Sequence, residues 1–348
     1  MRKKMRLLAC TLLISMLALV GCNTNKSTEN IKAAFDSINL LEYEKSLTSF
    51  DAAQEAKENP QLIARGRGIA YLGLAEYEKA IEQFLVALSY SDEFVDDFDF
   101  DTNYYLATAY YKNGQSEDAA KVYSAILALR DDREAYFLRG ITYLEQNKIN
   151  EAKADFDTAL AKNVTDYDMR IEIAQSLEEH GYKDEAKAYL QAALGNSEKK
   201  MSDYDKGRLS YYIGDYEAAR NYLEATKGNK DAKTILLLGQ TYEKLGDYNY
   251  AASIYSNYLT QNTGDVIIYN RLGMCKLEAG DAKSALEYFN QALALGETSM
   301  TQTLKFNQIV AYEYLGDFDQ AAVLMKNYLQ IYPDDTDAVR EYEFLKSR

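Results

Sequence analysis

Apolar and polar positions follow the period of an amphipathic α-helix along most of this chain. From about residue 27 onward, apolar residues recur three and four positions apart, in stretches that short polar turns separate. Only 2 prolines occur in 348 residues, and proline disrupts the interior of a helix. The pattern therefore predicts an all-α fold.

The helical pattern itself repeats at intervals close to 34 residues. Four turns carry similar segments: Gly214-Asp215-Tyr216, Gly246-Asp247-Tyr248, Gly280-Asp281-Ala282 and Gly316-Asp317-Phe318. Extending their register in both directions predicts nine repeats, which start at residues 27, 61, 100, 133, 167, 200, 232, 266 and 302. We expect residues 335–348 to form a final amphipathic helix that caps the array.

Three columns of the repeat explain how two helices would pack. Position 8 is small in eight repeats: Ala34, Gly68, Ala107, Gly140, Ala174, Gly207, Gly239 and Gly273, with Ile309 as the exception. Position 20 is alanine in every repeat but the first, which has Ser46, and position 24 is large in all nine. Small residues at positions 8 and 20 allow close helix approach, and the large residue at position 24 fills the space beside them.

The turn between the two helices of a repeat has its own signature. We expect a left-handed glycine after the first helix at Gly114, Gly181, Gly214, Gly246, Gly280 and Gly316. An N-cap of the second helix should follow at Asp215, Asp247, Asp281 and Asp317. Because neither helix can bury its apolar stripe alone, neighbouring repeats must stack.

The period and these columns resemble the tetratricopeptide repeat (TPR) family over nearly the whole chain after residue 26. The resemblance implies an α-solenoid, a right-handed superhelix of antiparallel helix pairs, over residues 27–334. It also implies a concave groove for a polypeptide, lined by positions 2, 5, 9, 12 and 13 of each first helix. The candidate groove residues here are Arg65, Ile69, Leu72, Tyr104, Tyr111, Phe137, Ile141, Tyr204, Tyr211, Tyr212, Asn270, Met274, Phe306 and Tyr314.

The chemistry of these groove candidates is mainly aromatic and aliphatic, with acidic neighbours. The Lys and Asn pair with which the family's best-known clamp holds a terminal carboxylate is missing, so that ligand is not supported. We expect instead an extended or helical polypeptide with apolar anchors and some positive charge. The alternative for each residue is that it packs between adjacent first helices.

Residues 1–21 have the pattern of a secretion signal. Four basic residues lie among the first six, and a 14-residue apolar run, too short to span a bilayer comfortably, follows to Val20. The run ends at Leu19-Val20-Gly21-Cys22, which resembles the lipobox of bacterial lipoproteins. The resemblance implies cleavage before Cys22 and lipid attachment to its thiol, with residues 22–26 as a short tether. The alternative is an ordinary secretion signal with a chance cysteine.

Composition narrows the function further. A net charge of −15 disfavours nucleic acid as a partner, because Lys and Arg must neutralise its phosphates. The chain has one histidine, His180, and three scattered cysteines, Cys10, Cys22 and Cys275. A multi-histidine metal site and a CxxC pair are therefore excluded, and no carboxylate pair stands out. We expect no enzyme activity, no metal and no cofactor.

One insertion departs from the 34-residue period. The repeat that starts at residue 61 is 39 residues long, and the added segment, residues 91–101, is acidic. Asp97, Asp99 and Asp101 have the spacing of the first half of a calcium-binding loop, but Thr102 and Thr108 replace its Gly and Glu. We expect a solvated loop; a calcium site and a partner contact through its Phe residues remain as alternatives.

Together these features predict a non-catalytic protein-binding scaffold, lipid-anchored through Cys22 on the outer face of a bacterial membrane. The cell membrane is favoured, with the outer membrane as the alternative. The tether reaches only about 14 Å, so the partner should be a protein or peptide at the cell envelope. Alternative functions are a role in outer-membrane assembly or pilus biogenesis, and a surface lipoprotein that binds peptides or glycans.

Overall fold

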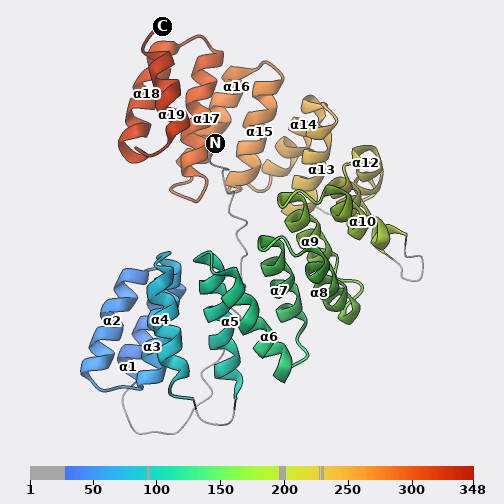
Figure 1. Ribbon diagram of the computed structural model, residues 1–348. Coiled ribbons are helices and arrows are strands. Elements are labelled where there is room, and N and C mark those ends of the chain that lie inside the picture. The colour runs from blue at the N-terminus through green and yellow to red at the C-terminus, as the bar shows by residue number, and fades with distance from the viewer. Residues whose placement is uncertain (1–27, 92–94, 196–200, 227, 229–230) are drawn as a thin grey trace. The chain divides into compact units, whose positions relative to one another are not determined.

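The regular structure of the chain is helical wherever it is described. The computed structural model describes residues 28–91, 95–195, 201–226, 228 and 231–348 (Figure 1). All regular elements in these residues are α-helices, and none of them is a strand. The all-α fold expected from the sequence is therefore confirmed. The predicted signal segment, Cys22 and the tether lie outside the described residues.

The described helices alternate between the first and second helices of the repeats, here named A and B helices. The A helices are α1 (Glu29–Asn39), α3 (Pro60–Gly73), α5 (Asp97–Lys112), α7 (Arg133–Glu145), α9 (Tyr167–Glu179), α11 (Asp203–Ile213), α13 (Ala232–Lys244), α15 (Val266–Glu278) and α17 (Thr301–Tyr314). The B helices are α2 (Tyr43–Glu55), α4 (Tyr77–Leu88), α6 (Ser116–Leu129), α8 (Ile149–Lys162), α10 (Lys183–Leu194), α12 (Tyr216–Glu224), α14 (Tyr248–Leu259), α16 (Ala282–Ala294) and α18 (Phe318–Ile331). Each A helix begins within three residues of a predicted repeat start, and α19 (Thr336–Leu345) is the expected terminal helix.

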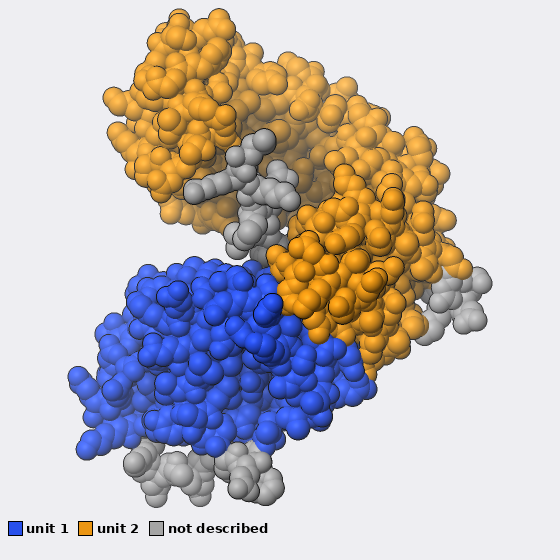
Figure 2. Space-filling model, viewed as in Figure 1, with its two compact units in different colours: residues 1–142 blue, residues 143–348 orange. Residues whose placement is uncertain are grey.

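The chain divides into two compact units, Met1–Thr142 and Tyr143–Arg348, with the division inside α7 (Figure 2). In the first unit α3 packs against α4 of its own repeat, and α4 packs against α5 of the next. The same pattern recurs in the second unit from α9 to α17, and α19 packs against α18. Consecutive A helices also touch, as α3 touches α5 and α9 touches α11. The predicted stacking of neighbouring repeats is thus present within each unit.

The small residue at position 8 faces the large residue at position 24. A Cβ atom on Gly239 would lie 2.2 Å from Cζ of Tyr255, and one on Gly273 would lie 2.4 Å from Cε1 of Phe289. Tyr255 and Phe289 are completely buried. These rings occupy the volume that a larger residue at position 8 would need, which confirms the packing that the repeat columns predicted.

The turns between A and B helices share one backbone conformation. The six predicted glycines have φ between +76° and +91°, and Leu41, Ala75 and Asn147 take the same left-handed region in other repeats. The predicted aspartate N-caps also form; Asp215, for example, accepts a hydrogen bond from the backbone N–H of Ala218 at 3.0 Å. The turn geometry is therefore common to the repeats even where glycine is replaced.

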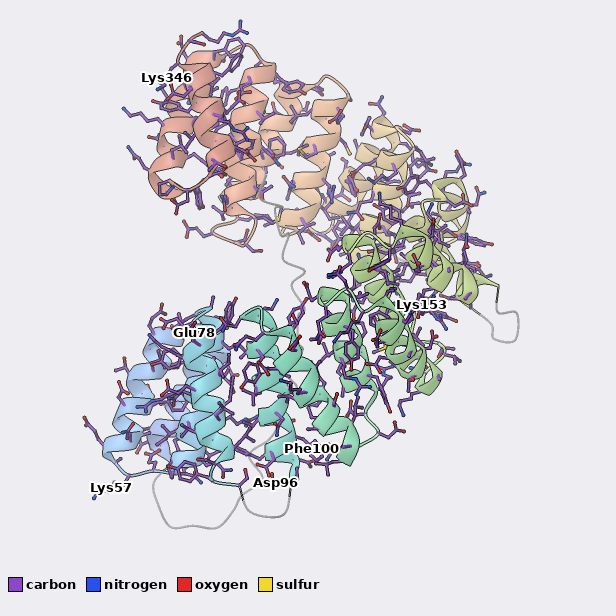
Figure 3. The ribbon with its side chains drawn as sticks, viewed as in Figure 1. Lys57, Glu78, Asp96, Phe100, Lys153 and Lys346 are labelled. Atoms are coloured by element: carbon purple, nitrogen blue, oxygen red, sulfur yellow. The ribbon has the colours of Figure 1, made fainter. Side chains whose placement is uncertain are left out.

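Residues 95–101 of the acidic insertion are described, and from Asp97 onward they are helical and not the expected loop. Asp97, Asp99 and Asp101 lie in the first turns of α5, close to the labelled Asp96 and Phe100 in Figure 3. Asp97 pairs with Arg130 at 2.8 Å, Asp101 lies 3.5 Å from Arg65, and Asp99 is 5% exposed. Because the three carboxylates have different neighbours on a helix, they do not converge as the ligands of a calcium loop do.

Among the helices of the described residues, none combines the length and the apolar character that crossing a bilayer demands. Likewise, no three His, Cys, Asp or Glu side chains in this part of the chain are grouped so that they could hold a metal ion.

The packing of position 8 against position 24 predicts whether a larger residue at position 8 raises or lowers the free energy of unfolding. Gly239→Ala should lower the free energy of unfolding by about 1–2 kcal/mol, because the new Cβ overlaps the buried Tyr255 ring. Helix propensity alone would raise it by about 1 kcal/mol. Urea unfolding followed by circular dichroism measures the difference. The control is Gly264→Ala, in a turn where an added Cβ meets nothing within 4 Å. A stabilised Gly239→Ala variant would contradict the packing argument.

Candidate functional site

The groove candidates of the first unit come from α3, α5 and α7. The charged residue among them, Arg65, already has an ion-pair partner. Arg65 lies 3.5 Å from the carboxylate of Asp101, and its guanidinium stacks 4.9 Å from the ring centre of Phe98 and 5.6 Å from that of Tyr105. Burial raises the pKa of the Asp101 carboxyl, and the charge of Arg65 opposes that rise. Arg65 therefore links two consecutive A helices.

Tyr104 is the groove candidate of α5 with the most unusual surroundings. Its ring lies 6.1 Å from that of Tyr123, and its buried hydroxyl has no hydrogen-bond partner among the described residues. Burial, and then the nearby carboxylate of Asp132, raise the pKa of this phenol. Ile69, Leu72, Tyr111 and Ile141 are likewise half-buried. Each of these side chains is therefore only partly available to a partner.

Two of the groove candidates lie in the core instead. Phe137 is only 3% exposed, and Asn270 is 8% exposed. The side-chain oxygen of Asn270 accepts a hydrogen bond from the amide nitrogen of Asn307 at 2.8 Å, which joins α15 to α17. Both side chains are buried in the structure, which agrees with the alternative that such residues pack within the array.

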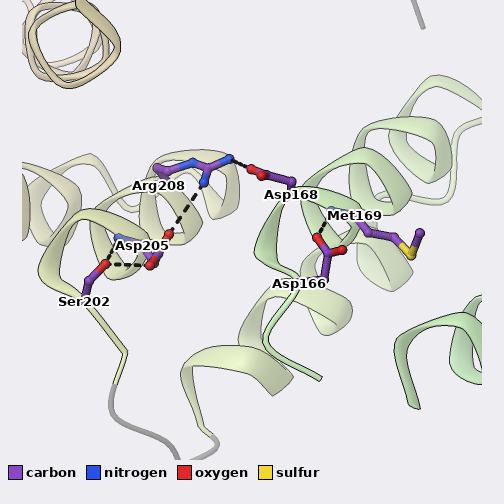
Figure 4. Close-up of polar contacts among 6 residues, drawn as sticks. All are labelled: Asp166, Asp168, Met169, Ser202, Asp205 and Arg208. Carbon is purple, nitrogen blue, oxygen red and sulfur yellow. Dashed lines mark hydrogen bonds and ion pairs between the residues drawn. The ribbon is translucent and has the colours of Figure 1, made fainter. Parts of the chain in front are cut away.

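In the second unit, Arg208 on α11 pairs with acidic residues of α9 and α11 (Figure 4). Its guanidinium forms an ion pair with Asp168 of α9, lies 3.5 Å from Asp205, and stacks 5.4 Å from the ring centre of Tyr204. Ser202 accepts a hydrogen bond from the backbone N–H of Asp205 at 3.1 Å and so caps α11. The sequence analysis missed Arg208, although it occupies groove position 9 of its repeat.

Three tyrosines pack together at the end of α11. The ring of Tyr211 is 5.4 Å from that of Tyr212 and 5.6 Å from that of Tyr216, both edge to face. Burial raises the pKa of Tyr211 to about 12. Tyr212 is 37% exposed, so this aromatic cluster has one member at the surface.

The last A helix, α17, carries the most exposed groove candidate. Tyr314 is 65% exposed, whereas Phe306 of the same helix packs edge to face against Tyr328 at 5.9 Å, and Met274 of α15 is half-buried. Tyr212 and Tyr314 both occupy position 13 of their repeats. Position 13 is therefore one place where the second unit presents aromatic rings to solvent.

Glu313, next to Tyr314, has an environment that the sequence analysis did not identify. One of its carboxylate oxygens is buried and accepts no hydrogen bond from the described residues. Burial, together with the charge of Glu341 on α19, raises the pKa of Glu313 to about 7. No sequence pattern predicts the raised pKa of Glu313, because Glu341 belongs to the terminal helix and not to a repeat column.

The residues that most often carry catalysis have structural roles here. His180 ends α9; its Nδ1 lies 2.7 Å from the carbonyl oxygen of Ser176, and its Nε2 lies 3.3 Å from Glu145. Cys275 is 1% exposed, and burial raises the pKa of its thiol. Both side chains are therefore engaged in contacts or burial within the fold.

Comparison with known sequences identifies the repeat. A sequence profile described as tetratricopeptide repeat matches residues 104–148, 137–200 and 236–299, and a second profile of the same description matches residues 304–335. Together they span more than half of the chain. The TPR repeat-containing protein MJ1428 of Methanocaldococcus jannaschii is 24% identical over 253 residues, which cover 68% of this chain and 43% of that protein. The chain thus matches less than half the length of this relative.

Two solved structures resemble parts of the chain. A tetratricopeptide repeat protein from Parabacteroides merdae has 15% sequence identity and a TM-score of 0.45, covering 72% of this chain and 98% of that one. The Pseudomonas aeruginosa pilF structure has 15% identity and a TM-score of 0.40, covering 71% of this chain and 96% of that one.

The shifted pKa of Glu313 predicts a pH dependence. The folded chain binds a proton that the unfolded chain releases near pH 4.5, so stability should fall as pH rises from about 4.5 to about 7. The full shift equals roughly 3 kcal/mol, and we expect about 1–2 kcal/mol after solvent screening. Glu313→Gln, which stays neutral, should be more stable than the wild type at pH 8 by this amount and similar at pH 5.

Urea unfolding at pH 5 and pH 8 measures this difference in stability. Glu297→Gln, an exposed glutamate in the turn before α17, is the matched control. If Glu313→Gln and Glu297→Gln show the same pH dependence as the wild type, the raised pKa of Glu313 is wrong.

Proposed function

The chain belongs to the tetratricopeptide repeat family, and from this premise we propose that it is a membrane-anchored, non-catalytic protein-binding scaffold of the bacterial cell envelope. TPR repeats are protein-interaction modules, and the exposed face of the A helices supplies the binding surface. The observation that carries the proposal is the exposure of Tyr212 and Tyr314 at the same repeat position. Exposed aromatic rings are typical anchors of protein interfaces.

The charge of the chain supports a partner that is apolar with some positive charge. The net charge is −15, and the exposed Glu178 and Glu179 lie on α9 in the same unit as Tyr212. A partner segment would place apolar side chains against the tyrosines and basic side chains near the acidic residues. Arg65 and Arg208 do not oppose this, because both are already paired with aspartates.

The membrane anchor in this proposal rests on the N-terminal sequence. A charged start, a 14-residue apolar run and the Gly21-Cys22 pair coincide as they do in lipoprotein precursors. Two or more acyl chains hold a protein stably on a membrane, whereas a single chain does not. The tether is short, so a partner would be met close to the membrane surface.

The anchor is tested by metabolic labelling with palmitate. Cys22→Ser should lose the label and accumulate as the uncleaved precursor, because the acylated thiol is gone. Cys10→Ser, a matched change inside the apolar run, should be labelled like the wild type. Continued labelling of Cys22→Ser would show that Cys22 is not the attachment site.

The binding surface is tested by affinity capture from envelope extracts with cross-linking. Changing Tyr212 and Tyr314 together to Ala should reduce recovery of the partner about tenfold, because two exposed anchors are lost. The control is Tyr90→Ala, which removes a tyrosine of similar exposure, 53%, that follows a B helix. Circular dichroism should show equal helicity in all variants. Undiminished capture by the double variant would place the binding surface elsewhere, and capture of glycans alone would favour the glycan-binding alternative.

A further inference from the structure

A pocket of about 590 Å³ opens in the second unit, away from the groove candidates. It lies between the B helices α8 and α10, with Arg170 of α9 among its lining residues; Lys153, labelled in Figure 3, is another. Its apolar lining consists of Leu160, Ala161, Val164, Ala188 and Ala192. Ligand pockets usually have volumes of about 300–1,000 Å³ and mostly apolar walls with a few polar groups.

Arg170 is the unusual residue of this pocket. Its Nη1 donates one long hydrogen bond, 3.3 Å, to the carbonyl oxygen of Tyr189, and its buried Nε has no acceptor among the described residues. No carboxylate of the described residues lies within 4 Å of the Arg170 guanidinium. Arg65 and Arg208, by contrast, both lie within that distance of an aspartate. Burial lowers the pKa of Arg170, and the nearby Tyr167, Tyr189 and Asp157 oppose that shift only in part.

The acidic residues of the pocket do not form an ion pair with Arg170. The carboxylate of Asp157 accepts a hydrogen bond from the hydroxyl of Tyr189 at 2.8 Å. Asp184 and Glu185 lie in the first turn of α10, where the helix dipole favours negative charge. The guanidinium of Arg170 has five N–H donors and uses one of them. The pocket therefore offers N–H donors of Arg170 that no acceptor of the described residues uses.

We propose that this pocket binds a carboxylate carried on a branched apolar group. The carboxylate would pair with the guanidinium of Arg170 in a charge-assisted hydrogen bond, and the apolar group would pack against Leu160, Val164 and Ala188. Such a group occurs at the C-terminal leucine of a polypeptide and in a free branched-chain acid. Asp184 and Glu185 disfavour further negative charge on the ligand. The site is independent of the A-helix surface proposed above.

Equilibrium dialysis of the full chain in detergent tests this site, with radiolabelled N-acetyl-leucine as the probe. We expect saturable binding that unlabelled N-acetyl-leucine displaces and N-acetyl-leucinamide, which lacks the charge, does not. Displacement by 4-methylpentanoate at the same concentration as by N-acetyl-leucine assigns a free acid. Weaker displacement by 4-methylpentanoate assigns a polypeptide C-terminus. In both cases the carboxylate is the recognised group.

Variants separate the pocket from the general surface. Arg170→Met should weaken binding at least tenfold while preserving helicity, since it removes a charge that has no partner in the fold. Ala192→Leu, which fills the pocket and keeps Arg170, should weaken binding similarly. Arg220→Met on α12 is the control, because Arg220 already pairs with Glu217. The proposal is overturned by absence of saturable binding at 10 mM probe (a concentration about ten-thousandfold above a micromolar Kd), by equal displacement with the amide, or by unchanged affinity in Arg170→Met.

Discussion

The close approach of the A and B helices within each repeat is the constraint on which the rest of the structure depends. It requires a residue without bulk at position 8, since the ring or aliphatic side chain of position 24 occupies the space beside it, as Tyr255 does against Gly239. A helix pair held this way still has an apolar stripe on each side. Burying those stripes against the next pair produces the stack of repeats.

This stacking also decides which residues remain free to bind. Consecutive A helices touch, so side chains at their contact become internal links: Arg65 with Asp101, Arg208 with Asp168, and Asn307 with Asn270. Polar groove positions are largely used in this way. Aromatic residues at the last turn of an A helix, such as Tyr212 and Tyr314, lie beyond the contact and stay exposed. The surface available to a partner is therefore more aromatic than the groove positions as a whole.

The B helices offer a different chemistry. The second unit has a pocket between α8 and α10 with an unpaired guanidinium and apolar walls, whereas its A helices present tyrosines near carboxylates. Two surfaces with opposite charge preference on one unit would allow the scaffold to hold two different groups. Glu313 adds a third feature, a half-buried carboxyl whose pKa is raised by burial and by the charge of Glu341 on α19.

The sequence by itself determined the repeat, because local rules fix it. Period, small and large columns, left-handed turn glycines and aspartate caps each depend on residues within one helix pair, and the structure places them as predicted. The position of the terminal helix followed from the same periodicity. These features need no knowledge of distant neighbours.

Only the tertiary structure decided the state of individual side chains. Phe137 and Asn270 share repeat positions with groove residues, yet both are buried, and Asn270 is hydrogen-bonded to Asn307 of the next A helix. Asp97, Asp99 and Asp101 have calcium-like spacing, but the start of α5 separates their carboxylates. The unpaired charge of Arg170 and the raised pKa of Glu313 depend on which residues the neighbouring helices bring near them. A repeat pattern specifies the position of a residue on its helix, whereas packing across repeats specifies which residues its side chain contacts.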